Sequence, residues 1–279
     1  MVVYIKTHCR PDKQLTYQTL RRCGYTGEIV FVVDDEDKTV RQLESNVSND
    51  KRVQIKIFCK EEMVQKIDCG TNNPKRNVNL YAWCACEEIH RVFRRDEIFV
   101  MADDDITDFR FRYLEDGKMK SVKITQNMDN ILDYLSEFMV KNNVTALSSG
   151  IPQMYFNKDL DATTCNCRVP YNFVMRNTLF EMNWKAEFQE EIITSIESSN
   201  RGEYIMAFPM IQHTIMPLGK EAGGMHDAYA SDESFKLSQY GHIWHPTAEV
   251  PMLYKGKWIT SIKREKAFPK LISSSCKKN

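Results

Sequence analysis

Runs of apolar residues alternate with amphipathic stretches through the first part of the chain. Short segments rich in Val, Ile and Phe are each typical of a buried strand. They cover residues 2–6, 28–33, 53–57 and 97–101. Apolar residues at helical spacing lie between them, at residues 15–23, 39–48 and 75–94. This alternation predicts an α/β fold with a mostly parallel, doubly wound sheet flanked by helices, which binds ligands at the carboxyl ends of its strands.

The pattern becomes less regular in the second half. It predicts a hairpin with strands at 109–113 and 119–125, followed by an amphipathic helix at 128–141. Further on it predicts a strand at 144–147, a helix at 188–198 and a strand at 204–208. Clear periodicity is lacking in residues 151–175 and 217–234. Because no internal repeat or linker is visible, we expect a single domain over residues 1–279 with an irregular C-terminal half.

The composition fits a globular protein that buries a large core. Hydrophobic residues make up 42% of the 279 residues and charged residues 27%, which excludes an intrinsically disordered chain. No apolar run approaches the roughly 20 residues that cross a bilayer. The first residues enter a strand pattern at once instead of forming a signal peptide. We therefore expect a cytoplasmic protein.

The nine cysteines favour the same compartment, because an odd number in a long chain does not suggest a disulfide framework. They include C-x-C pairs at Cys84/Cys86 and Cys165/Cys167 but no C-x-x-C pair. Since structural zinc sites usually show C-x-x-C spacing, the sequence favours reduced thiols over a zinc cluster.

Charge is unevenly distributed although the formal net charge is zero. Residues 255–279 hold eight lysines and arginines against one glutamate. A basic end on an acidic body is typical of a protein with a polyanionic partner. The same pattern fits a solvated, frayed terminus, and charge alone does not separate the two interpretations.

Three consecutive carboxylates, Asp103, Asp104 and Asp105, follow the apolar segment 97–101 almost directly. Adjacent carboxylates repel one another, and removing them from water without a cation is costly. A divalent metal offsets this cost, since Mg²⁺ and Mn²⁺ prefer oxygen ligands and commonly bridge carboxylates to a diphosphate. An exposed acidic turn is the alternative. The position at the ligand-binding edge of the predicted sheet favours the metal site.

Several segments resemble GT-A fold glycosyltransferases. Residues 98–105, Ile-Phe-Val-Met-Ala-Asp-Asp-Asp, are similar to the D-x-D segment of those enzymes. The loop 7–12 resembles their first nucleotide-contacting loop, and residues 32–35 resemble their second-strand acidic site. Residues 75–77 resemble a basic nucleotide-contacting position. The resemblance covers residues 1–110 well and the rest loosely.

The resemblance implies a UDP-sugar donor and a bound Mn²⁺ or Mg²⁺ ion, which would stabilise charge on the leaving diphosphate. The implied donor-binding residues are Thr7, Arg10, Asp34, Asp35, Arg76, Asp103 and Asp104. The implied metal ligands are Asp103, Asp105, His213 and His226. Carboxylates suit ribose hydroxyls and arginines suit phosphates, although helix capping and surface solvation remain alternatives. The chain then divides into a nucleotide-sugar-binding half (1–110), an acceptor and catalytic half (111–254) and a basic C-terminal segment (255–279).

A candidate catalytic base lies in residues 187–193. This segment resembles the acidic segment that opens a helix in many inverting GT-A enzymes, where a carboxylate takes the proton from the acceptor hydroxyl. Carried over, Glu190 or Glu191 is the base, with Glu in place of the usual Asp. Acidic residues also favour the first turn of any helix, so both interpretations stay open.

Two histidines are candidate metal ligands. His213 follows the predicted strand 204–208, where GT-A enzymes often place such a ligand. His226 lies in the Gly-rich stretch 217–234, which suits a loop that closes over the sugar and excludes water. A purely structural histidine is the alternative for each.

The acceptor rests on a looser resemblance. The three aspartates, the Gly-Gly-Met-His-Asp stretch and the basic end look similar to phage-type, TET-associated glycosyltransferases that modify hydroxymethylpyrimidines in DNA. This resemblance implies 5-hydroxymethylcytosine or a related base in duplex DNA as acceptor. Such an enzyme contacts phosphates and reaches or flips the base, for which the basic end and the aromatic residues of 151–175 are candidates.

Two other functions compete with this interpretation. A transferase of surface polysaccharide or glycan synthesis shares the donor site and differs only in its acceptor. A non-catalytic nucleotide-binding or metal-binding module needs fewer of the candidate residues, so the full acidic and basic set argues against it. We expect no membrane association and no protein partner.

Overall fold

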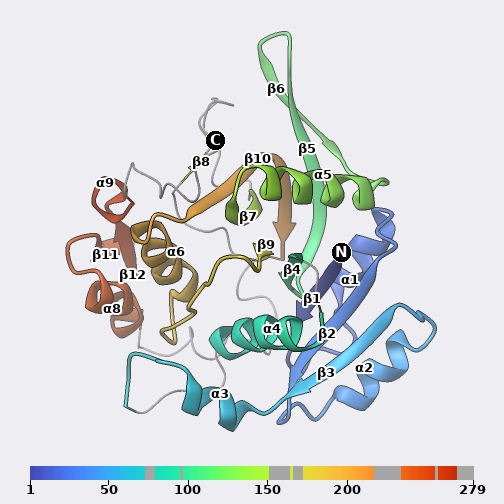
Figure 1. The fold of residues 1–279 in the computed structure, drawn as a ribbon, viewed down its shortest axis with the longest axis horizontal. Helices are drawn as coiled ribbons and strands as arrows, with labels where there is room; N and C mark the ends of the chain where they lie inside the picture. Colours follow the sequence, from blue (N-terminus) through green and yellow to red (C-terminus); the bar gives the residue numbers. More distant parts are fainter. Residues whose placement is uncertain are drawn as a thin grey trace.

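The computed structural model describes residues 1–72, 79–94, 97–150, 164–165, 172–216, 234–254 and 257–268. Its main feature is a ten-stranded sheet with the strand order β3-β2-β1-β4-β9-β7-β10-β5-β6, to which β8 is added through β10. Helices pack on this sheet, and a separate two-stranded sheet, β11-β12, lies beside α8 (Figure 1). The fold is therefore α/β, as the alternation of strands and helices predicted.

The first half of the sheet is parallel. It consists of β1 (Val2–Lys6), β2 (Glu28–Asp34), β3 (Val53–Phe58) and β4 (Ile98–Asp103). The connecting helices are α1 (Leu15–Arg22), α2 (Val40–Val47), α3 (Lys60–Lys66) and α4 (Asn79–Phe93). Because parallel strands must be joined by crossovers, the carboxyl ends of β1, β2 and β4 meet at one edge of the sheet.

Both faces of the parallel half are covered, so every residue of β1 is buried. Side chains alternate between the two faces. Val3 and Ile5 belong to a core cluster that includes Leu20 of α1 and residues of α5. Val2 and Tyr4 belong to a second cluster that is formed largely with α4. The central strands therefore read as continuous apolar runs in the sequence.

The second half of the sheet is mixed. β9 (Phe173–Asn177) runs antiparallel between β4 and β7 (Val144–Gly150), and β10 (Tyr204–Ile215) lies parallel to β7. β5 (Ile106–Glu115) and β6 (Lys118–Lys123) form a hairpin that projects from the sheet, at the top of Figure 1. The other helices here are α5 (Met128–Lys141) and α6 (Glu190–Asn200). Most strands still share one direction, as expected, because only β5, β8 and β9 run the opposite way.

Two predictions from the pattern are wrong in ways that matter for the site. The strand predicted at 204–208 continues to Ile215, so His213 lies within β10 and not after a strand. β9 begins inside the stretch 151–175, for which no regular element was expected. It was missed because Arg176, a polar residue in the sequence, is fully buried there and pairs with Glu87.

The C-terminal part contains elements that the pattern did not predict. They are α8 (Ser234–Trp244), β11 (Glu249–Tyr254), β12 (Lys257–Ile262) and α9 (Arg264–Ala267), besides the short β8 (Thr164–Cys165). Ala248, Ala267 and Phe268 form a small core with Ile196 of α6. A frayed terminus is therefore the wrong interpretation for residues 257–268, while residues 255–256 and 269–279 lie outside the described chain.

Candidate functional site

Strand register brings the predicted site residues to one edge of the sheet. Lys6, the last residue of β1, pairs with Asp103 at the end of β4, and with Val32 of β2. Thr7 follows β1 directly, and Asp34 is the last residue of β2. The polar residues that end three neighbouring strands therefore lie side by side, as expected for parallel strands.

Asp103 is held by one group from β1 and one from the residue before β9. The Lys6 ammonium lies 2.5 Å from its Oδ1, and the Asn172 side-chain amide donates to its Oδ2 at 2.6 Å. The same ammonium lies 3.4 Å from the centre of the Trp83 ring, on α4. Asp103 thus has its charge balanced within the fold, by a buried cation that packs against an aromatic face.

Asp104 joins the first loop to the aspartate cluster. Its carboxylate accepts a hydrogen bond from Thr7 Oγ1 at 2.6 Å and one from Arg10 Nη1 at 3.2 Å. Burial raises the pKa of Asp104, although Arg10 and Thr7 act against that rise. The prediction that Thr7, Arg10 and Asp104 belong to one site is consistent with these contacts, but here the three residues bind each other.

Asp105 differs from its two neighbours. Its Oδ1 is buried and has no hydrogen-bond partner among the described residues. Burial, together with the charges of Asp103 and Asp104, raises the pKa of Asp105 to about 7. A buried carboxylate oxygen without a donor is costly, and a cation bound beside it offsets that cost. Asp105 therefore fits the predicted metal ligand.

His213 offers a second vacant donor atom at the same edge. The imidazole is fully buried, and its Nδ1 lies 2.7 Å from Ser149 Oγ on β7. Its Nε2 has no partner among the described residues. Burial lowers the pKa of His213 to about 4, against an opposing effect of Asp103. The ring is therefore neutral at pH 7, which is the form that binds metals.

The end of β10 makes backbone contacts with the residues that follow β4. The Met216 backbone N–H donates to the Asp105 carbonyl at 3.1 Å, and Ile215 pairs with Ile106 across the two strands. His213 therefore lies three residues before Met216, whose backbone contacts Asp105 directly. The residue types at this edge, two carboxylates and a neutral imidazole, fit a divalent ion such as Mn²⁺ or Mg²⁺.

Glu190 and Glu191 occupy the first turn of α6, as expected. Glu190 is buried, and burial raises its pKa well above the ordinary value, with Glu191 adding to the rise. The charges of Lys6 and Asp103 also act on Glu190. Glu190 therefore belongs to the electrostatic environment of the aspartate cluster, and it is the stronger of the two candidates for the base.

The second-strand carboxylates have separate roles. Asp34 is buried and binds Lys60 Nζ at 2.9 Å and His8 Nδ1 at 2.6 Å. Burial acts to raise the pKa of Asp34, but these two partners outweigh it and lower the pKa to about 2. Asp35 is exposed and accepts the Lys60 backbone N–H at 3.1 Å. Asp35 is thus the more accessible group for a ribose or base.

Some predicted site residues lie outside the described chain. They are Arg76 and His226, together with the Gly-rich stretch 217–233 and the aromatic residues of 151–163 and 166–171. The pattern also missed residues that organise the site, namely Lys6, His8, Lys60, Trp83, Ser149 and Asn172. Of these only Lys6 and His8 carried a signal, because they flank the end of a predicted strand at the ligand-binding edge.

Among the described residues, every helix is too short or too polar to span a membrane. The sequence of the chain matches the family model of TET-associated glycosyltransferases over residues 1–224. No curated protein matches it.

Three solved structures illustrate what its fold is similar to. S. aureus TarS 1–349 in complex with UDP-GlcNAc is 12% identical, with a TM-score of 0.48, and the match covers 87% of this chain and 64% of TarS 1–349. The galactosyltransferase LgtC is 9% identical, with a TM-score of 0.39 and coverage of 64% and 58%. The inositol-1-phosphate CTP transferase of T. maritima is 9% identical, with a TM-score of 0.37 and coverage of 79% and 91%. Likeness at this level does not identify a function.

The family match is of a different kind, because it covers most of the chain and includes every described site residue from Thr7 to His213. It agrees with the resemblance carried by the aspartate cluster and by the loops after β1 and β2. The chain belongs to the TET-associated glycosyltransferase family.

Proposed function

We propose that the protein is a metal-dependent glycosyltransferase that moves a sugar from a UDP-sugar to the hydroxyl of 5-hydroxymethylcytosine, or a related hydroxymethylpyrimidine, in DNA. Family membership supports the transferase and this acceptor class. The observation that carries the metal is the pair of vacant donors, Asp105 Oδ1 and His213 Nε2, at one sheet edge. Asp105 and His213 fit a bound Mn²⁺ or Mg²⁺ ion, and Asp103 is the third candidate ligand.

A bound Mn²⁺ or Mg²⁺ ion would supply charge stabilisation for the departing diphosphate. The residues of the chain provide the remaining chemistry. Arg10 lies at the same edge of the sheet and is held by Asp104. A guanidinium group suits the binding of phosphate oxygens. Lys6 balances Asp103 and so keeps the cluster from carrying three uncompensated charges. Asp35 is the accessible carboxylate for the nucleoside.

Glu190 is the proposed base. Its raised pKa makes it a stronger proton acceptor than an ordinary glutamate once it is ionised. It takes the proton of the acceptor hydroxyl as the oxygen bonds to the anomeric carbon and the bond from that carbon to the UDP oxygen breaks. Attack from the side opposite the leaving UDP inverts the anomeric centre.

The test measures UDP release from UDP-sugars in the presence of Mn²⁺. Duplex DNA with 5-hydroxymethylcytosine, unmodified duplex DNA and no DNA form the three arms, and UDP-GlcNAc is one of the donors because it is bound in TarS. Release that only modified DNA stimulates supports the whole proposal. Metal-dependent release that is indifferent to DNA redirects the acceptor to glycans. Pyrophosphate as the product would contradict the transferase and indicate a nucleotidyltransferase.

Paired variants test the base. Glu190→Gln is expected to lower kcat by about 10²–10⁴-fold, the range for loss of a general base, while KM for the UDP-sugar changes little. Glu191→Gln, one residue away and only partly buried, is the matched control and should retain most activity. Equal losses in both variants, or a larger loss in Glu191→Gln, would remove Glu190 from this role.

A further inference from the structure

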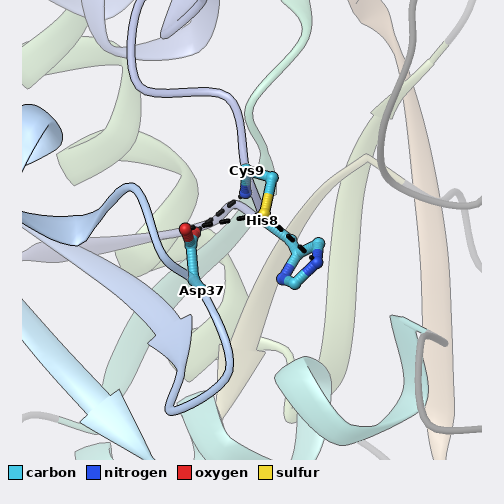
Figure 2. Close-up of side chains that lie close together, drawn as sticks. All are labelled: His8, Cys9 and Asp37. Atoms are coloured by element: carbon cyan, nitrogen blue, oxygen red, sulfur yellow. Dashed lines mark hydrogen bonds between the residues drawn. The ribbon is translucent and has the colours of Figure 1, made fainter.

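The loops after β1 and β2 bring three more potential metal ligands together, outside the aspartate cluster. One ligand atom each from His8, Cys9 and Asp37 lies within 4.8 Å of the others. Figure 2 shows the three side chains close together. Cys9 Sγ is 3.5 Å from His8 Nε2 and 3.7 Å from Asp37 Oδ1. The set is one sulfur, one nitrogen and one oxygen, which is a ligand set that zinc accepts.

The two separations from Cys9 Sγ are close to the edges of a zinc coordination tetrahedron. Zinc–sulfur bonds are about 2.3 Å and zinc–nitrogen bonds about 2.0–2.1 Å long. Two such bonds at a tetrahedral angle place their ligand atoms about 3.5 Å apart. The distance from Cys9 Sγ to His8 Nε2 has this value, and that from Sγ to Asp37 Oδ1 is slightly longer. Small side-chain movements are enough to seat an ion.

The surroundings orient each ligand in the way that metal sites require. His8 Nδ1 bonds to Asp34 Oδ2 at 2.6 Å, which leaves Nε2 for a metal. Asp37 Oδ2 accepts the Cys9 backbone N–H at 2.8 Å, and its Oδ1 accepts from the Thr39 N–H and hydroxyl at 2.7 Å. Carboxylates that bind metals are commonly hydrogen-bonded in this manner.

The backbone conformation at Cys9 also favours a metal site. Cys9 has φ of 53°, in the left-handed region that residues with a Cβ rarely adopt. The hydrogen bond from its N–H to Asp37 holds this conformation, with the thiol beside both partner side chains. Cys9 is also exposed, so a metal ion reaches the thiol from solvent.

We propose that His8, Cys9 and Asp37 bind one Zn²⁺ ion, with water as the fourth ligand, and that this ion ties the loop after β1 to the loop after β2. The Cys9 thiol releases its proton to solvent as the sulfur–zinc bond forms, and His8 binds as the neutral ring. Thiolate and imidazole select zinc over Mg²⁺ and Mn²⁺. The proposal therefore requires neither the metal proposed at Asp105 nor the transferase activity.

The test uses the full chain, stripped of metal with a chelator and then titrated with Co²⁺ and Zn²⁺. We expect one equivalent of Co²⁺ to produce a thiolate-to-cobalt charge-transfer band, which Zn²⁺ then abolishes. The aspartate cluster gives no such band because it contains no sulfur. Cys9→Ser should lose the band and bind Zn²⁺ at least about 100-fold more weakly, beyond the loss caused by removing an outer partner.

Matched variants keep the test decisive. Cys59→Ser changes another cysteine that is not part of this cluster and should retain the band and the Zn²⁺ affinity. His8→Asn should weaken Zn²⁺ binding without losing circular dichroism, which separates ligand loss from misfolding. A band that persists in Cys9→Ser would move the site to other cysteines and overturn the proposal. So would equal Zn²⁺ affinity in Cys9→Ser and Cys59→Ser, or the absence of any band in the unaltered protein.

Discussion

The ends of β2 and β4 each carry an aspartate at the same sheet edge, in opposite electrostatic settings. Asp34 binds two basic side chains, and although burial acts to raise its pKa, those partners lower it to about 2. Asp105 has a buried oxygen without a partner among the described residues, and burial with its acidic neighbours raises its pKa to about 7. The first carboxylate is balanced within the fold and stabilises it. The second is left for an external cation.

The largest expected effect comes from removing the unbalanced carboxylate. Asp105→Asn should lower transferase activity by about 10²–10⁴-fold, since a metal ion contributes several kcal/mol to charge stabilisation in a transition state. Its folded state should not suffer, because the substitution removes a buried carboxylate that repels its neighbours. The measurements are UDP release at saturating Mn²⁺ and the thermal midpoint in chelator.

Asp116→Asn is the matched control for that experiment. Asp116 lies at the exposed tip of the β5–β6 hairpin with φ of 51°, a conformation that Asn adopts readily. It should keep full activity and stability. Activity in Asp105→Asn equal to that of this control would refute the metal assignment, and a large loss of stability in Asp105→Asn would make the contrast with Asp34 wrong.

The balanced carboxylate should behave in the reverse manner. Asp34→Asn is expected to destabilise the fold by about 3 kcal/mol at pH 7, because it leaves the buried Lys60 ammonium without its principal partner. The folded-state pKa is lowered from 3.8 to about 2. The ionised form therefore stabilises the protein above about pH 4, and that contribution is lost as the pH falls from about 4 towards 2.

Denaturant unfolding at several pH values measures this effect. The difference between Asp34→Asn and the unaltered protein should shrink below about pH 4. Asp50→Asn is the comparison, since Asp50 pairs with Arg21 in a more exposed setting and should cost less than about 1 kcal/mol. A pH-independent difference for Asp34→Asn would show that its ion pairs do not carry the stabilisation.

The smallest effect concerns the orientation of His213. Ser149→Ala removes the hydroxyl that bonds to His213 Nδ1, so the imidazole loses its fixed tautomer and direction. The Mn²⁺ concentration for half-maximal activity should rise by about 10–100-fold, while activity at saturating Mn²⁺ changes less. Ser148→Ala, whose hydroxyl bonds instead to the Ser149 carbonyl, should leave the Mn²⁺ requirement unchanged. Similar shifts in both variants would assign Ser149 a role in packing alone.

Strands buried on both faces and helices buried on one face were predictable from the sequence. β1, β2 and β4 are covered on both faces and read as apolar runs. The predicted helix at 128–141 coincides with α5, because one face packs on the sheet and the other is solvated. The aspartates that follow β4 were visible for the same reason, since a carboxylate run stands out after an apolar strand.

Residues whose role depends on a distant partner were not predictable. Arg176 made β9 look like a loop, although Glu87 balances its charge. The predicted strand at 204–208 stopped before Pro209, which has no N–H to donate, but β10 passes this point through a register shift between Phe208 and Gln212. Lys6 closes a predicted buried strand, but only the fold brings Asp103 and Trp83 to it.

The position of Lys6 has a practical consequence for spectroscopy. Its ammonium lies against the Trp83 ring and against Asp103, and Trp83 in turn stacks on Trp184 with ring centroids 4.9 Å apart. Any change of charge at Asp103 therefore alters the electric field on a buried indole. Indole emission responds to such fields, so the chain carries its own optical reporter, and titrating unlabelled protein with metal or nucleotide reads out events at this strand end.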